Sequence, residues 1–109
     1  MGLSRYIDEI IQQYYATIVC DVPFDDILID LRSAHILSND EVNRLQQGQN
    51  HQDVGFEFLE ILKSKNDQDF FRFCNILEDN EIAKVQSLGL NLVIAANKKI
   101  QLHSKSYYI

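Results

Sequence analysis

The segment 56–77 constrains the fold most, because it carries two apolar stripes on either side of a short polar stretch. Each stripe places apolar residues at i, i+3, i+4 and i+7, a period that is typical of an α-helix and not of a strand. The first stripe comprises Gly55, Phe58, Leu59 and Leu62, and the second comprises Phe70, Phe73, Cys74 and Leu77. Between the stripes, residues 64–67 offer Asn66 or Asp67 as the N-cap of the second helix.

Two helices joined by so short a loop are expected to pack antiparallel. Each buried phenylalanine ring removes roughly 150–250 Å² from water. We therefore predict that this hairpin forms the core that the other helices cover. Its phenylalanines are Phe56, Phe58, Phe70, Phe71 and Phe73.

The remaining chain also has helical periodicity. Residues 3–14 carry one apolar stripe, and residues 15–22 carry a second stripe one position out of phase, which predicts a long first helix that bends near residues 14–16. Pro23 restarts the chain as a second helix with an apolar face over residues 24–31. The box Ser38-Asn39-Asp40-Glu41 opens a third helix, and Asn50 caps the fourth.

A short sixth helix is predicted after Asn80, with Ile82, Val85 and Leu88 facing inward and Gly89 as its stop. The residues alone therefore indicate one all-α domain over residues 1–89, a compact antiparallel bundle. Residues 90–109 form a C-terminal extension with three open alternatives: a further helix, an extended arm on the core, or a linker to further sequence.

The composition of the chain excludes some classes of partner and indicates a compartment. The chain has 109 residues, which fits one domain, and 46% hydrophobic residues, which argues against disorder. Its net charge of −6 disfavours nucleic acid or an anionic membrane as a partner, because both require a basic footprint. Without a secretory leader or a membrane-spanning run, a reducing cytoplasm is the expected compartment, with Cys20 and Cys74 as small core residues.

No cofactor, metal site or catalysis is predicted. His35, His51 and His103 lack metal-ligand spacing with each other or with the cysteines. Asp25 and Asp26 are adjacent on a helix and do not face each other, so they do not form an acid–base pair.

Three passages resemble caspase recruitment domains, a branch of the death-fold superfamily. Residues 34–42, AHILSNDEV, resemble the family's passage between helices two and three, and residues 58–67, FLEILKSKND, resemble the end of helix four. Residues 69–77, DFFRFCNIL, resemble the passage that follows, and the order and spacing agree over about residues 3–88.

The resemblance implies a six-helix antiparallel Greek-key bundle without catalytic activity. Such domains bind one another in apoptotic or innate-immune signalling, commonly through a basic face on helices one and four and an acidic face on helices two and three. This chain departs from the basic pattern, because Arg5 is the only basic residue of its first helix. We therefore expect it to supply the acidic side to a basic caspase recruitment domain, within a possible higher-order oligomer.

The candidate contact residues follow from this comparison. The acidic face comprises Asp25, Asp26, Asp30, Asp40 and Glu41, and minor basic contacts are expected at Arg5, Lys63, Lys65 and Arg72. The alternatives are the regulatory prodomain of a caspase or nucleotide-driven switch, a stand-alone decoy, or a plain helical bundle with the same core pattern. Without the resemblance, the charges would be interpreted as a solvated helix face; with it, a binding role is the favoured interpretation.

Overall fold

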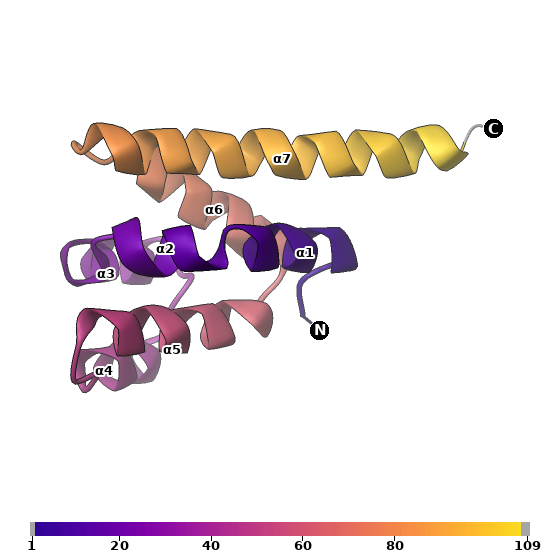
Figure 1. Cartoon of the computed structure of the whole chain (residues 1–109). Helices are drawn as coiled ribbons and strands as arrows, with labels where there is room; N and C mark the ends of the chain where they lie inside the picture. The colour runs from indigo at the N-terminus through magenta and orange to yellow at the C-terminus, as the bar shows by residue number, and fades with distance from the viewer. Residues whose placement is uncertain (1, 108–109) are drawn as a thin grey trace.

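The computed structural model describes the backbone of residues 2–107 and the side chains of residues 2–102. The described chain is all-helical, which confirms the predicted fold class at that level. Its helices are α1 (Arg5–Gln13), α2 (Tyr15–Asp21), α3 (Phe24–Ser33), α4 (Asn39–Gln46), α5 (His51–Lys63), α6 (Asp67–Glu78) and α7 (Ala83–Tyr107). Figure 1 shows α7 lying along one side of the bundle and extending past the other helices at its C-terminal end.

The predicted bend in the first helix is confirmed as a break at Tyr14, which separates α1 from α2. Tyr14 has φ −102° and ψ 11°, outside the helical range. The break lets both out-of-phase stripes reach the core: Ile7, Ile10 and Ile11 are buried from α1, and Ile18 and Val19 from α2.

The core is centred on Phe58, whose ring centroid lies 5.2 Å from that of Phe24 and 4.9 Å from that of Phe73. These three rings, and that of Phe70, are fully buried. The prediction was wrong for Phe56, which is 44% exposed and stacks on Tyr15 at the surface. Phe56 lies outside the i, i+3, i+4, i+7 stripe of its helix. Its position on the helix, and not its apolar side chain, therefore decides that it is exposed.

The prediction that the two helices of the segment 56–77 pack against each other as an antiparallel hairpin is wrong. Both helices form, but α6 packs most extensively against α7, and α5 packs against α2 and α4. Figure 1 shows α6 leaving the end of α5 obliquely and rising towards α7. The rings of Phe58 in α5 and Phe73 in α6 contact each other and link the two helices within the core.

The predicted stop at Gly89 is also wrong. α7 continues as one helix from Ala83 to Tyr107, and Gly89 is buried within it. A Cβ at Gly89 would lie 2.8 Å from the carbonyl oxygen of Cys74, so this glycine permits close contact between α7 and α6. The boundary drawn between residues 89 and 90 therefore falls inside a helix.

Of the three alternatives for residues 90–109, the helix is the one observed as far as residue 107, and residues 108 and 109 lie outside the described residues. Leu92 and Ala96 belong to the buried core. At the start of α7, Val85 and Leu88 are buried as predicted, but Ile82 is 44% exposed because the helix begins only after it.

The predicted caps are confirmed. Ser38 and Glu41 form the capping box of α4, Asn50 caps α5, and Asn66 caps α6 with Asp69 completing a second capping box. Cys74 is buried as expected, whereas Cys20 is exposed, which corrects its assignment to the core.

Candidate protein-interaction surface

Three of the predicted acidic residues lie on the outer face of α3. The helix turns Phe24, Ile27, Leu28 and Leu31 into the core. Asp25, Asp26 and Asp30 therefore face solvent, and all three are exposed. Two of them lie in the first turn of α3, where a negative charge is favoured by the helix dipole.

Asp26 and Asp30 line a groove of about 770 Å³ between α3 and the connection from α6 to α7. Asp79 and Glu81 lie on the other side, and Ile76 and Ile82 contribute apolar surface. Four carboxylates thus meet around an opening that no described lysine or arginine lines. We call this set (Asp26, Asp30, Asp79 and Glu81) the acidic groove.

Sequence reasoning missed Asp79 and Glu81. The run Glu78-Asp79-Asn80-Glu81 was visible as a charge cluster, but it lies far from α3 in the sequence. Only the packing of α3 against α6 brings this run, at the end of α6, beside Asp26 and Asp30.

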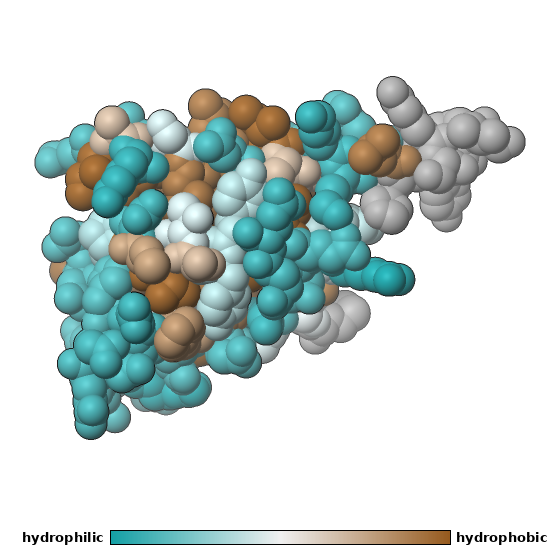
Figure 2. Space-filling view, in the orientation of Figure 1, coloured by the Kyte–Doolittle hydropathy of each residue, from teal (hydrophilic) through white to brown (hydrophobic). Residues whose placement is uncertain are grey.

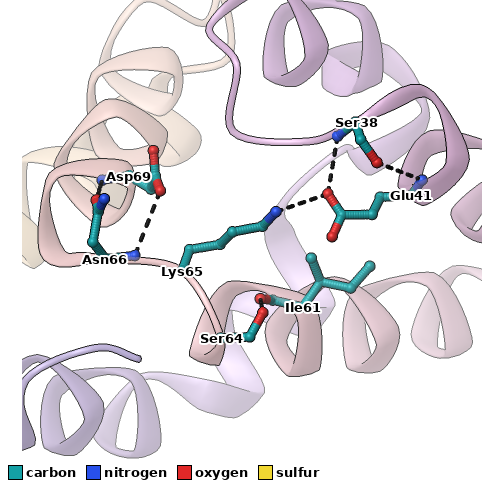
Figure 3. Close-up of polar contacts among 7 residues, drawn as sticks. All are labelled: Ser38, Glu41, Ile61, Ser64, Lys65, Asn66 and Asp69. Carbon is teal, nitrogen blue, oxygen red and sulfur yellow. Dashed lines mark hydrogen bonds and ion pairs between the residues drawn. The ribbon is translucent and has the colours of Figure 1, made fainter. Parts of the chain in front are cut away.

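The remaining acidic candidates lie at the start of α4, and neither lines the acidic groove. Asp40 is exposed, but the carboxylate of Glu41 is already bound within the domain. One Glu41 oxygen accepts hydrogen bonds from the backbone N–H of Ser38 at 2.9 Å and from the Lys65 Nζ at 2.9 Å (Figure 3). Glu41, predicted as an acidic contact, and Lys65, predicted as a basic contact, therefore neutralise each other within the domain.

The other basic candidates are dispersed and are engaged in local ion pairs. Arg5 lies 3.6 Å from Glu9 in α1, Lys63 lies 3.6 Å from Glu60 in α5, and Arg72 lies 3.2 Å from Asp69 in α6. They come from three different helices, and the structure does not bring them together into one basic face.

Glu41 has a lowered pKa. Burial alone would raise the pKa of this carboxyl group, but the hydrogen bond and charge of Lys65 and the hydrogen bond from Ser38 outweigh it. A lowered pKa in the folded state means that ionised Glu41 stabilises the fold above its unfolded-state pKa. This contribution disappears as the pH falls through the lower, folded-state pKa.

We therefore expect Glu41→Gln to lower the free energy of unfolding by about 1 kcal/mol near neutral pH, because Lys65 loses its charged partner. The difference from the native chain should shrink as the pH is lowered and Glu41 becomes protonated. Urea unfolding at about pH 7 and about pH 3 measures both effects. Glu60→Gln is the matched control, since it removes a more exposed ion pair with Lys63; an equal loss in both variants would contradict the role given to Glu41.

The cysteines and histidines form no metal-binding group among the described side chains. Burial, and secondarily the charge of Glu78, raises the pKa of the Cys74 thiol far above its usual range, so this thiol is unreactive. No three His, Cys, Asp or Glu side chains within residues 2–102 are placed to hold a metal ion. The side chain of His103 lies outside the described residues.

Comparison of the chain with protein-family models, with curated proteins and with solved structures finds no match. Within the described residues, no helix combines the length and the apolar character that a membrane crossing requires.

Proposed function

We propose that the chain is a protein–protein interaction module of the caspase recruitment type, which binds a partner domain and catalyses no reaction. The helical order supports this proposal: with α1 and α2 counted as the halves of one bent helix, six helices remain. In this proposal they form the antiparallel Greek-key bundle of the death fold, and α7 is its lengthened last helix. The expected setting is apoptotic or innate-immune signalling in the cytoplasm, as an adaptor or as the prodomain of a longer protein.

The observation that carries the proposal is the convergence of four carboxylates in the acidic groove. Exposed like charges gathered around one opening raise the rate of encounter with a basic partner, although each exposed pair adds little affinity. The partner in this proposal is another caspase recruitment domain with a basic face. Its lysine or arginine side chains would enter the groove, and its apolar residues would contact Ile76 and Ile82.

The proposal gives the predicted contact residues different roles. Asp26 and Asp30 are central to the proposed interface, Asp25 and Asp40 are exposed outside the groove, and Glu41 has a structural role. Asp79 and Glu81 join the interface from the opposite side. Arg5, Lys63 and Arg72 are minor contacts at most in this proposal, because they are dispersed and paired.

The test is the affinity of a purified caspase recruitment domain with an exposed basic face, measured by titration calorimetry against native and variant chains. Asp30→Lys should weaken binding at least tenfold. The change should not impair folding, because Asp30 is exposed in the last turn of α3, where a positive charge suits the helix dipole. Glu60→Lys makes the same charge change on an exposed face of α5 and should leave affinity nearly unchanged.

If both variants bind the partner as tightly as the native chain does, the acidic groove is only solvated surface. If both lose affinity alike, net charge and not the groove controls binding. Circular dichroism of both variants excludes unfolding as the cause.

A further inference from the structure

The exposed apolar side chains are concentrated on α7 from residue 90 onwards. Of the seven large hydrophobic residues exposed within residues 2–102, four lie there: Leu90, Ile94, Ile100 and Leu102. Figure 2 shows hydrophobic surface over the middle of α7 and again towards its C-terminal end. The exposed fraction is 51% for Ile94 and 63% for Leu102, so neither side chain contributes mainly to the core.

Part of this surface is one wall of a groove of about 340 Å³ between α1 and α7. Ile10 of α1 and Tyr14 at the end of α1 line one wall, and Ile94 and Leu102 of α7 line the other. The groove lies beside the break between α1 and α2, because Gln13 and Tyr14 are among its lining residues. An ion pair between Lys99 Nζ and Glu9 Oε2, 2.6 Å apart, joins the two walls.

The charge of this groove is opposite to that of the chain. The chain has a net charge of −6, yet the charged residues that line the groove are Lys98 and Lys99. Lys99 is paired with Glu9, whereas no carboxylate among the described side chains forms an ion pair with Lys98. Lys98 is exposed and lies between Ile94 and Leu102 on one row of α7, each separated from the next by one helical turn.

We infer that the groove between α1 and α7 binds an amphipathic helix with an acidic flank, supplied by a partner protein. The row Ile94, Lys98 and Leu102 forms an i, i+4 ridge, the kind of ridge that fits the grooves of a second helix. Apolar side chains of that helix would cover Ile94 and Leu102, and its carboxylates would pair with Lys98. The inference is independent of the proposed function, because none of these residues lines the acidic groove.

Two other occupants fit the surface less well. A second copy docked through the same face would bring two Lys98 side chains together. An anionic membrane would attract Lys98 but repel a chain of net charge −6, and a concave groove presents less apolar surface to a bilayer than a convex helix face does. The acidic helix alone satisfies both the shape and the charge.

The probe is a displayed library of helical peptides about four turns long, selected on the full native chain. The expected enriched sequences carry apolar residues at i, i+3 or i+4 and i+7, flanked by Asp or Glu. Ile94→Ser/Leu102→Ser should weaken the best peptide at least tenfold, and Lys98→Glu should weaken it several-fold and reduce its dependence on salt. Ile29→Ser, on the exposed face of α3, and Lys84→Glu, near the start of α7, are the matched controls and should bind like the native chain.

Four results would overturn the inference: enrichment of peptides with basic flanks, binding that the variants do not change, no enrichment at all, or loss of binding in the controls as well. Two further measurements address the other occupants. If phosphatidylserine vesicles bind the native chain but not Ile94→Ser/Leu102→Ser, the surface belongs to a membrane contact instead. If sedimentation shows a dimer that this variant abolishes, the occupant is a second copy.

Discussion

Phe58→Ala should remove most of the stability of the domain, lowering the free energy of unfolding by about 3–5 kcal/mol. The Phe58 ring is fully buried and lies between Phe24 of α3 and Phe73 of α6. Its removal leaves a cavity at the point where three helices meet, and flanking rings of this size cannot collapse into it fully. Because small domains are stable by only about 5–15 kcal/mol, the variant should unfold at much lower urea concentration.

The chain offers a matched control on the same helix. Phe56→Ala makes the same substitution two residues away, but Phe56 is 44% exposed and contacts Tyr15 at the surface. Its loss should cost about 1 kcal/mol or less. Equal losses at the two positions would mean that the core is not organised around Phe58.

Gly89→Ala should destabilise the domain by about 1–3 kcal/mol, even though alanine favours a helix interior over glycine by about 1 kcal/mol. The added Cβ would lie 2.8 Å from the Cys74 carbonyl oxygen and 2.9 Å from the Glu78 backbone nitrogen. These are backbone atoms, so α6 and α7 would have to separate along the most extensive helix contact of the bundle. Thermal and urea unfolding followed by circular dichroism measure the loss.

Ser87→Ala serves as the control for helix propensity, because Ser87 is exposed two residues earlier in α7. It should be neutral or stabilising by about 0.5 kcal/mol. A gain in stability for Gly89→Ala similar to that of Ser87→Ala would show that α7 does not depend on close contact at this glycine.

The parts of the fold that depend on local sequence were predictable. Helical periodicity identified the buried faces of α3, α5 and α6, and side-chain chemistry identified Ser38, Asn50 and Asn66 as caps. These features depend on residues a few positions apart, within one or two turns of a helix. The break at Tyr14 was likewise visible as a change of phase between two apolar stripes.

The parts that depend on distant residues were not predictable. Gly89 was predicted to stop a helix, because the sequence does not reveal that the backbone of α6 occupies the space where a side chain would lie. Glu41 and Lys65 are 24 residues apart, so their ion pair was invisible and both were assigned to docking. The acidic groove combines α3 with the end of α6 in the same way, and Asp79 and Glu81 were missed for that reason.

The continuity of α7 has a geometric consequence for how the domain could assemble with others. The acidic groove lies where α7 begins, and Lys98 lies about 20 Å further along the same helix, at a rise of about 1.5 Å per residue. One uninterrupted helix would therefore act as a rigid spacer between the two proposed binding surfaces. Partners bound at both proposed surfaces would be held at a fixed separation, so the domain would work as a bridge between them.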